Sequence, residues 1–450
     1  MITPGASTVI DSLLFRDAFG TPEMRAIFSD RASIDRYVEI EIALARAEAQ
    51  CGVIPADAAR EIAARANPAA FDAELLKRET DNVGYPILPV VHQMAKQCGE
   101  AGRYVHWGAT TQDIMDTAVV LQMRAAFDLV ERDIEEIRRI LADLATRHRD
   151  TAMAGRTHLQ QALPITFGYK AAIWRTMFDR HAERLAQLRP RLLVVQFAGA
   201  AGTLASLGDK GLEVQEALAR ELGLAVPAAP WHVARDNFAE AVNFLGLVTG
   251  SLAKIAFDVM LLMQNEVGEA FEPFAPGRGG SSTMPQKRNP ISSELIVAAA
   301  KAVRQHAGLM LDAMVQDLER ATGPWHAEWI AIPESFVLAA GALCQARTML
   351  GGLVVDEARM RRNLNLTHGL IVAEAVMMGL APHIGRPRAH DVVYGACRTV
   401  ADKGGSLAEV LASMPEITSH LDRAAIDRLT DPANYVGLAP RMVDRALGIE

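Results

Sequence analysis

Cysteine and excess positive charge are both scarce in this sequence, and each shortage excludes a class of protein. Four cysteines among 450 residues, far apart at Cys51, Cys98, Cys344 and Cys397, form neither a paired metal motif nor the dense pattern of a disulfide-stabilised secreted domain. The formal net charge of −8 argues against a nucleic-acid partner, because binding phosphates requires a basic face. We therefore expect a protein of a reducing compartment whose thiols are buried or incidental.

A long uninterrupted hydrophobic run is also missing from the sequence. The most apolar long segment, residues 241–263, is interrupted by Asn243, Lys254 and Asp258, so we interpret it as a core helix rather than a membrane span. The first fifteen residues contain no lysine or arginine and lead into no apolar run, which argues against a secretory signal. The sequence thus predicts a cytoplasmic protein without a membrane partner.

What the sequence does contain is helical periodicity. Apolar residues recur at three- and four-residue steps from Ile114 to Leu144, which predicts one very long helix. Further long helices are predicted at 161–188, 237–271, 291–318 and, broken by Pro333, 325–350. Strand signals are weak, because residues 191–196 could extend briefly but no alternating run bounded by hairpin turns is evident. The fold class is therefore predicted to be all-α.

The long helices predict a central bundle flanked by two smaller helical domains. Residues 241–263 are apolar nearly all round, and Gly246 and Gly250 permit close approach of another helix, so we expect burial against neighbouring subunits in a homo-oligomer. Shorter helices are predicted at 33–51 and 56–66 before the bundle and at 357–384 after it. We divide the chain into an N-terminal helical domain (1–110), a central long-helix bundle (111–354) and a C-terminal helical domain (355–450).

The segment 279–290, Gly-Gly-Ser-Ser-Thr-Met-Pro-Gln-Lys-Arg-Asn-Pro, concentrates reactive and anion-binding groups between two helices. Removing a proton alpha to a carboxylate creates a dianion, so such a site needs a strong base and positive potential. Ser281 or Ser282 could be the base if backbone N–H groups, a helix N-terminus or the ammonium of Lys287 stabilise its alkoxide. The alternative is a surface turn whose hydroxyls only cap the helix at Pro290.

Two other segments supply candidate site residues. Residues 155–164 set His158 and two amides on a turn before a long helix, and a histidine tuned by a carboxylate can orient a substrate or move a proton. Residues 104–113 place Thr110 and Thr111 at the start of the first long helix, where neutral donors and the helix dipole favour an anion. A satisfied structural histidine and simple N-capping are the alternatives.

Arginines are the remaining cationic candidates. Arg156, Arg235 and Arg320 could each pair with a substrate carboxylate through the two-pronged geometry of the guanidinium group. For a single arginine, a solvated or structural ion pair is the alternative.

The segment 279–290 resembles the signature loop, Gly-Ser-Ser-x-Met-Pro-x-Lys-x-Asn-Pro, of the fumarase/aspartase superfamily. This superfamily includes class II fumarase, argininosuccinate lyase, adenylosuccinate lyase and 3-carboxy-cis,cis-muconate cycloisomerase. The segment 155–164 resembles its Thr-His region, and 104–113 its His-x-Gly-x-Thr-Ser-x-Asp region, with Thr111 in place of serine. Glu294 lies thirteen residues after Ser281, where several lyases place the glutamate that pairs with the histidine.

The resemblance covers essentially the whole chain and implies a set of site residues. Catalytic roles are implied for Ser281, His158, Glu294 and Lys287, and substrate binding for Thr110, Thr111, Thr157, Gln160, Ser282 and Asn289. To the substrate-binding set we add Arg235 and Arg320, the cationic candidates named above. The resemblance also implies an enzyme without cofactor or metal, and a homotetramer whose active sites are each assembled from three subunits.

Within the superfamily, residues 196–203, 271–277 and 325–329 look most like bacterial 3-carboxy-cis,cis-muconate cycloisomerases of aromatic catabolism, which form a lactone. The chain departs from that branch by keeping the lyase-like pair of His158 and Glu294. The leading prediction is a cofactor-independent enzyme that transfers a proton alpha to a carboxylate of a small polycarboxylate, most like these cycloisomerases. The alternative is a carbon–nitrogen lyase or epimerase on a substituted aspartate such as iminodisuccinate, argininosuccinate or adenylosuccinate. A non-catalytic structural protein with this fold is a third hypothesis.

Adenylosuccinate is the least supported of these substrates. Asn82 stands near the position where adenylosuccinate lyases place a second catalytic histidine, which argues against cleavage of a nucleotide substrate.

Overall fold

The computed structural model describes residues 7–449 and falls into two compact units. The first contains Met1–Ile134, His181–Leu252 and Leu295–Gln345, and the second contains Glu135–Arg180, Ala253–Glu294 and Ala346–Glu450. Every break between the units falls inside one of the five longest helices, so both units are built from segments of the same helices. The division into three sequence-based domains stays a prediction.

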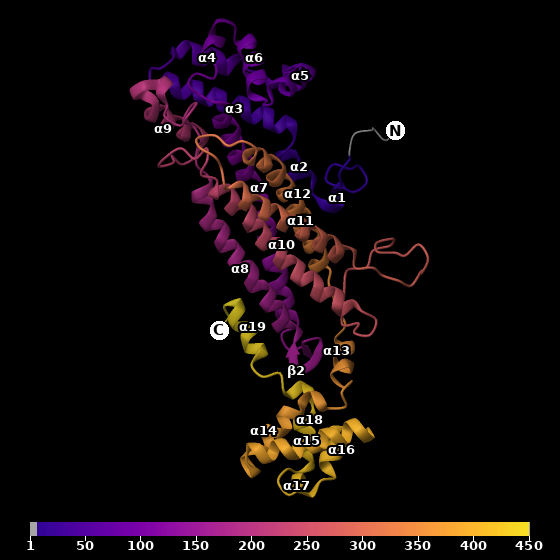
Figure 1. Ribbon diagram of the computed structural model, residues 1–450. Helices are drawn as coiled ribbons and strands as arrows, with labels where there is room; N and C mark the ends of the chain where they lie inside the picture. Colours follow the sequence, from indigo (N-terminus) through magenta and orange to yellow (C-terminus); the bar gives the residue numbers. More distant parts are fainter. Residues whose placement is uncertain (1–6, 450) are drawn as a thin grey trace. The chain divides into compact units, whose positions relative to one another are not determined.

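The all-α class is confirmed by the five long helices, which are drawn in Figure 1. They are α7 (Thr111–Arg147), α8 (Phe167–Leu192), α10 (Asp236–Met263), α11 (Ile291–Ala313) and α12 (Pro324–Gly351). The predicted break of α12 at Pro333 is wrong, because the helix continues through the proline. A proline removes one backbone hydrogen bond, and the buried neighbours Ile332 and Phe336 hold the helix in the core on both sides of it. Two predicted ends are too long, since α10 ends at Met263 and α11 at Ala313.

Aromatic and polar contacts join the long helices in each unit. In the first unit the ring of Phe127 on α7 lies 5.9 Å from Phe244 on α10 and 4.8 Å from Phe336 on α12. In the second unit Trp174 on α8 donates its Nε1–H to Asp258 on α10 at 3.0 Å. Aromatic pairs at these separations add to the stability that comes from burying apolar area.

The first unit also contains the N-terminal helices. They are α1 (Arg16–Phe19), α2 (Pro22–Ile27), α3 (Asp30–Gln50), α4 (Ala56–Arg65), α5 (Ala73–Val83) and α6 (Ile87–Cys98). A later helix of the same unit, α9 (Gly211–Leu222), packs against α3. The predicted helices at 33–51 and 56–66 correspond to α3 and α4. Ser29 caps α3 by accepting the N–H of Ala32, and Gly52 follows the helix with a φ of 74° that suits glycine. Val38, Ile62 and Met94 form the core between α3, α4 and α6.

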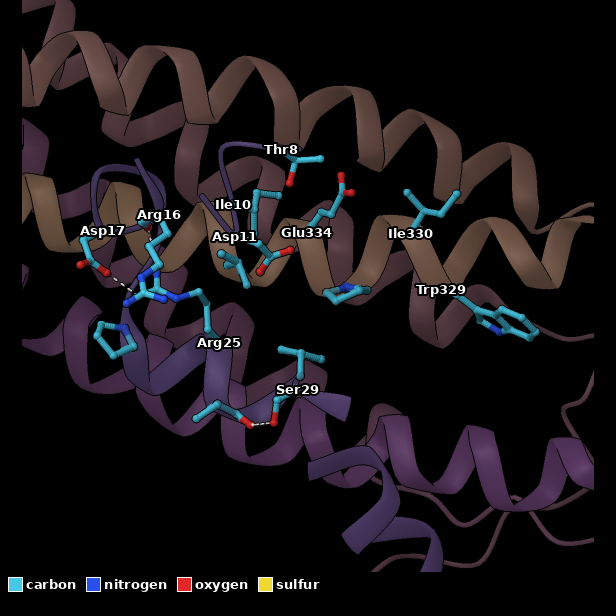
Figure 2. Close-up of a pocket in the computed structure, with 15 residues that line it drawn as sticks. Thr8, Ile10, Asp11, Arg16, Asp17, Arg25, Ser29, Trp329, Ile330 and Glu334 are labelled. Atoms are coloured by element: carbon cyan, nitrogen blue, oxygen red, sulfur yellow. Dashed lines mark hydrogen bonds and ion pairs between the residues drawn. The ribbon is translucent and has the colours of Figure 1, made fainter. Parts of the chain in front are cut away.

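The segment before α3 lies along α12 and leaves an open groove of about 710 Å³. Figure 2 shows Ile330 and Glu334 reaching into this groove from α12, with Arg25 on its other side bound to Asp17 and to the backbone of Arg16. The groove contains none of the predicted site residues. Its importance is structural, because it marks where the N-terminal segment crosses the core helix.

Glycine at position 341 allows this crossing. A Cβ atom at Gly341 would lie 2.4 Å from the backbone carbonyl of Phe19. We expect Gly341→Ala to lower the free energy of unfolding by about 1–3 kcal/mol, because the clash outweighs the better helix propensity of alanine. Urea denaturation measures this change.

Gly395 in α15 (Arg386–Lys403) is the matched control, since a Cβ there meets no atom within 4 Å. Gly395→Ala is expected to stabilise the protein by about 0.5–1 kcal/mol through helix propensity alone. Equal stabilisation by both substitutions would show that the N-terminal segment does not lie on Gly341.

A β-hairpin in the second unit corrects the sequence analysis. Strands β1 (Ala152–Thr157) and β2 (Gln160–Thr166) pair antiparallel, whereas the sequence pattern indicated no hairpin. The reason is the connection, because the two turn residues are His158 and Leu159 rather than the Asn-Gly or Asp-Gly pair that marks such turns. Both have left-handed backbone angles, with φ of 51° and 63°. A second short pair joins β3 (Ala270–Phe271) to β4 (Val354–Val355).

Most of the C-terminal part of the second unit forms a small helical cluster, seen at the bottom of Figure 1 in orange and yellow. After α13 (Glu357–Leu364) the cluster consists of α14 (Ala373–Ile384), α15, α16 (Leu407–Ala412), α17 (Pro415–Thr418) and α18 (Arg423–Thr430). The last helix, α19 (Ala439–Leu447), lies apart from it, where Arg175 of α8 donates to the carbonyl of Ala446. The single helix predicted at 357–384 is wrong, because the chain leaves the helix after Leu364 and Gly369 adopts a φ of 93°. An α-helix cannot continue through that conformation.

Two of the described helices, α10 and α12, are long and apolar enough to cross a membrane by length and composition alone. In the most apolar 18-residue stretch of α12, 67% is buried inside the protein, and in the corresponding stretch of α10 44% is buried. On α12 the buried carboxylate of Glu328 belongs to a network described below, and on α10 the side chain of Asp258 is bound by Trp174 and Lys254. We therefore interpret both as core helices, as the sequence predicted for 241–263.

Candidate active site

The segment 279–290 is a loop of the second unit that connects β3 to α11. In Figure 1 it extends away from α11. Its two ends pair with each other, through a bridge between Gly280 and Arg288 and through the N–H of Asn289, which donates to the carbonyl of Gly279 at 2.9 Å. A Cβ at Gly279 would lie 2.5 Å from the carbonyl oxygen of Asn289, and its φ of 67° also requires glycine. The glycines of the motif therefore close the neck of the loop.

Ser281 lies inside this loop with its hydroxyl oxygen facing backbone donors. Its Oγ accepts the N–H groups of Thr283 at 3.2 Å and Met284 at 3.0 Å. Two N–H groups aimed at one oxygen stabilise negative charge there, which is what a serine base needs. The adjacent Ser282 is exposed, and its hydroxyl lies only at 3.5 Å from that of Thr283. Lys287 is exposed on the same loop.

Glu272 anchors the loop to α11, although no sequence pattern pointed to this residue. Its carboxylate is buried and accepts the N–H groups of Ser292 at 3.1 Å and Ser293 at 2.8 Å, as well as the hydroxyl of Ser293 at 2.7 Å. These are the donors that a helix N-terminus leaves free. Because this cap comes from a residue twenty positions earlier in the chain, local capping rules could not identify it.

The hairpin carries the second group of predicted residues at its tip. Thr157, His158 and Gln160 are all exposed there, and Thr157 pairs with Gln160 across the turn. Glu294 is exposed in the first turn of α11. Among residues 7–449, neither the side chain of His158 nor that of Glu294 forms a hydrogen bond or ion pair, so their predicted pairing stays a prediction.

Arg156 holds the hairpin in place through an ion pair with Glu269 and is not free to bind a substrate. Its guanidinium binds the buried carboxylate of Glu269 with both Nη atoms, at 2.8 and 2.7 Å. Asn363 on α13 donates to the same carboxylate at 2.7 Å. Two-pronged pairs of this kind hold both partners in one orientation, so β1 is tied to the segment that leads to the loop.

Thr110 and Thr111 belong to the first unit, at the N-terminus of α7. Nη1 of Arg320 donates to Oγ1 of Thr110 at 3.1 Å, which leaves the hydroxyl proton of Thr110 free to donate elsewhere. Nη2 of Arg320 donates to the carbonyl of Ala200 at 3.0 Å, and its Nε is buried without a partner among the described residues. A helix N-terminus, a free hydroxyl proton and a guanidinium together form a suitable place for a carboxylate.

Asp113 holds the turn before α7 together. One carboxylate oxygen accepts the N–H groups of Thr110 at 3.0 Å and Gly199 at 2.9 Å, and the other accepts that of Ala198 at 3.0 Å. Nε2 of His232 lies 2.7 Å from the same carboxylate. The turn before α7 is thus bound to the segment 196–203, which lies far away in the sequence.

Arg235 is a correction to the predicted substrate ligands. Its side chain is fully buried, and all five N–H groups are used by Asp116, Glu328 and the carbonyl of Trp231. The guanidinium also stacks 4.6 Å from the centre of the Phe238 ring. No donor is left for a substrate carboxylate, so Arg235 is a structural residue.

His106 is a residue of the third motif to which the sequence analysis gave no role. The buried carboxylate of Glu41 accepts its backbone N–H at 3.0 Å and lies 2.6 Å from its Nδ1. Burial alone would lower the pKa of His106, but the charge and hydrogen bond of Glu41, together with the charge of Asp113, raise it above its usual value. A histidine two residues before a glycine in a motif rich in hydroxyls was the available signal.

This pair gives a pH-dependent prediction. A histidine whose pKa is raised on folding stabilises the protein fully below its unfolded pKa of about 6.5, and the contribution is lost as the pH rises through the folded pKa. We expect Glu41→Gln to cost about 1–3 kcal/mol at pH 6.5 and less at pH 8.5. Urea denaturation at the two pH values measures the difference.

Two neighbouring acids set the limits of this experiment. Glu48 is buried, and burial together with the charge of Glu41 raises the pKa of Glu48 to about 9, so its own contribution to stability changes across the tested pH range and both proteins of the comparison carry Glu48→Gln. Asp113 faces the same histidine and is unchanged in the variant. An equal loss of stability at both pH values would show that Glu41 does not act through the charge of His106.

The structure therefore arranges the predicted residues in two groups. Ser281, Ser282, Lys287 and Asn289 share the loop, with Glu294 on the next helix and Thr157, His158 and Gln160 on the hairpin, all in the second unit. Thr110, Thr111 and Arg320 form a separate group in the first unit. Among the described residues no hydrogen bond joins the loop to the hairpin.

Comparison with known proteins identifies the family. A family model described as "Lyase" matches residues 18–304, and one described as "Adenylosuccinate lyase C-terminus" matches residues 369–446. The 3-carboxy-cis,cis-muconate cycloisomerase of Pseudomonas aeruginosa is 49% identical over 98% of this chain and 97% of its own length. The N-acetyl-S-(2-succino)cysteine lyase of Dickeya dadantii is 42% identical over 98% and 97%, respectively.

A solved structure agrees with these relatives. The crystal structure of fumarate lyase from Mesorhizobium sp. BNC1 is similar with a TM-score of 0.91 and 56% sequence identity, over 96% of this chain and 99% of that one. The "Lyase" family model, over residues 18–304, spans both the hairpin and the loop. The chain therefore belongs to the lyase family and is an enzyme of the fumarase/aspartase superfamily.

Proposed function

We propose that this enzyme transfers a proton at the carbon alpha to a carboxylate of a small polycarboxylate, without a cofactor, and that its reaction is lactone formation of the 3-carboxy-cis,cis-muconate type. The observation that carries the proposal is the pair of backbone N–H groups that face Oγ of Ser281. They lower the cost of an alkoxide at that oxygen. The 49% identity to the Pseudomonas aeruginosa cycloisomerase over nearly the whole chain supports the choice of reaction.

The chemistry follows from the groups on the page. In lactone formation a carboxylate oxygen of the substrate adds to the double bond, and the electron pair moves to the carbon next to a second carboxylate. The resulting dianion takes a proton at that carbon from Ser281, and in the reverse direction Ser281 removes it. Lys287 and Asn289 stabilise the dianion from the loop, while Ser282 hydrogen-bonds a substrate oxygen. Thr110, Thr111 and Arg320 bind a carboxylate distant from the reacting bond.

In this proposal the active site is assembled from more than one chain, as the resemblance to the superfamily implies. We propose a homotetramer in the cytoplasm, in which loop, hairpin and the turn before α7 come from different subunits. Large apolar side chains are exposed on α10, with Leu247 52%, Phe257 50% and Leu261 40% accessible. Exposed apolar stripes of this kind mark protein interfaces. Sedimentation of the purified protein measures the oligomeric state.

A second candidate function is elimination from, or epimerisation of, a substituted succinate or aspartate. The exposed His158 on the hairpin favours it, with Glu294 as the predicted partner, because a second acid–base group can protonate a leaving heteroatom or the opposite face of the carbon. The relative from Dickeya dadantii, a lyase of N-acetyl-S-(2-succino)cysteine, supports it as well.

One experiment tests the common step and separates the two reactions. The enzyme is incubated in deuterium oxide with 3-carboxymuconate, iminodisuccinate, argininosuccinate and N-acetyl-S-(2-succino)cysteine, and products are analysed by NMR. We expect one deuterium at the carbon alpha to a carboxylate together with a lactone from 3-carboxymuconate. Fumarate release or loss of stereochemical purity would favour the second function. If the intact tetramer incorporates deuterium at carbon in none of the four compounds, both proposed functions are contradicted.

A further inference from the structure

A cavity of about 170 Å³ lies in the first unit, between the start of α3 and the helices α7 and α12. Its walls are mostly aromatic and aliphatic, and they include Phe28, Tyr37, Phe238, Trp325 and Trp329. A cavity of about 150 Å³ with apolar walls is known to hold one benzene ring. The space therefore suits one aromatic ring and little more.

The open groove of Figure 2 adjoins this cavity. Phe28, Trp329 and Pro333 line both spaces. In Figure 2 the ring of Trp329 lies at the end of the groove opposite to Asp17 and Arg25. A small molecule can therefore approach the cavity from the groove.

Three polar groups at the cavity have hydrogen-bonding capacity that the described residues leave unused. The hydroxyl of Tyr37 forms no hydrogen bond with any residue of the range 7–449, although the side chain is partly buried. Ser33 accepts an amide N–H of Gln122 at 3.1 Å, which leaves its hydroxyl proton free to donate. Gln122 is buried and also donates to the carbonyl of Ile27 at 2.8 Å. This bond fixes the orientation of the amide and leaves its Oε1 without a donor among the described residues.

All three groups are neutral and lie close together. Burial raises the pKa of Tyr37 to about 12, with the charge of Asp30 acting in the same direction, so its hydroxyl keeps its proton near neutral pH. Ser33 and Tyr37 are four residues apart on α3 and therefore lie on one face of that helix. Together with Oε1 of Gln122 they offer two donors and one acceptor. A single hydroxyl group on a ligand complements this set, because it can accept two hydrogen bonds and donate one.

The charged groups at the cavity disfavour an ionic ligand. Asp116 and Glu328 line it and share the guanidinium of Arg235, so the local balance of charge is negative and opposes an anion. All four of their oxygens already accept N–H groups from Arg235, from Trp325 or from Gln316. An ammonium ion would find each of these oxygens occupied. The cavity therefore suits a neutral ligand.

We propose that this cavity is a ligand site for a neutral phenol with one ring, which packs among the aromatic walls. The hydroxyl of the ligand accepts from Ser33 and Tyr37 and donates to Oε1 of Gln122. Water is the competitor for these groups, and one water molecule can bond to all three. Further waters need about two to four polar partners each, which the apolar walls do not supply. The proposal concerns binding and does not rest on the proposed function.

Calorimetric titration of the full-length enzyme with phenol and with benzene tests the site. Tyr37→Phe keeps the ring and removes one donor, so we expect phenol to bind about three- to tenfold more weakly and benzene to bind as before. Val119→Phe on α7 places a ring inside the cavity and should abolish the binding of both probes. Tyr394→Phe is the matched control, because it removes the hydroxyl of an exposed tyrosine on α15 and should leave binding unchanged.

A crystal structure of the wild-type enzyme soaked in phenol gives a second readout that does not depend on the stability of any variant. We expect one ring between Tyr37 and Trp329, with its oxygen within hydrogen-bonding distance of Ser33. Water alone in the cavity, or unchanged phenol affinity in a folded Val119→Phe variant, would overturn the proposal. An equal loss of phenol and benzene binding in Tyr37→Phe would also overturn it. Because neither measurement uses turnover, both remain decisive even if the proposed reaction is wrong.

Discussion

Ser281→Ala is expected to lower kcat by about 10²–10⁴-fold while the fold stays intact. The substitution removes the oxygen that the N–H groups of Thr283 and Met284 face, and with it the group that moves the proton. The hydroxyl forms no contact with the helical core, so the free energy of unfolding should change by less than about 0.5 kcal/mol. Steady-state kinetics on the turned-over substrate and urea denaturation measure the two quantities.

Ser282→Ala is the matched control for this experiment. Ser282 is adjacent and exposed, and it lacks the two backbone donors. We expect it mainly to raise KM, because its hydroxyl binds substrate in the proposal. A larger loss of kcat in Ser282→Ala than in Ser281→Ala would show that Ser282, not Ser281, is the base. Wild-type activity in Ser281→Ala would exclude both the base and the mechanism built on it.

The second large effect is expected on stability rather than on rate. Arg235→Met should lower the free energy of unfolding by about 3–5 kcal/mol, because it leaves the carboxylates of Asp116 and Glu328 buried without a cation. Both acids are nearly inaccessible, and each is bound by two N–H groups of this guanidinium. Urea denaturation at a fixed protein concentration measures the loss.

Neutralising the two acids provides the control. In the triple variant Arg235→Met with Asp116→Asn and Glu328→Gln no charge is buried, so at least half of the lost stability should return. If Arg235→Met costs less than about 1 kcal/mol, the network does not hold the first unit together as described. If Arg235→Met instead has normal stability and a raised KM, Arg235 binds the substrate.

Helix periodicity predicted the architecture because the long helices bury a continuous apolar stripe. The pattern in residues 114–144 therefore identified α7 almost completely. The same reasoning failed at Pro333, since packing on both sides of α12 outweighs the loss of one hydrogen bond. It also failed at the hairpin, because His158 and Leu159 adopt left-handed angles that their residue types do not favour.

In the candidate site, too, the sequence predicted some features and missed others. Ser281, Lys287 and Asn289 stand close together in one short segment, so the motif alone placed them on one loop. The role of Arg235 was wrong because one arginine looks the same in sequence whether its partner is a substrate or a buried acid. Glu41, Glu272 and Glu269 were missed because each acts on a residue far along the chain.

The sequence by itself determined the helical class, the family and the loop that carries the proposed base, because these depend on local periodicity and on a contiguous motif. Only the tertiary structure decided which charges are free. It paired Arg156 with Glu269 and Arg235 with two buried acids. The physical reason is that the state of a charged group depends on its neighbours in space, and those neighbours come from distant parts of the chain.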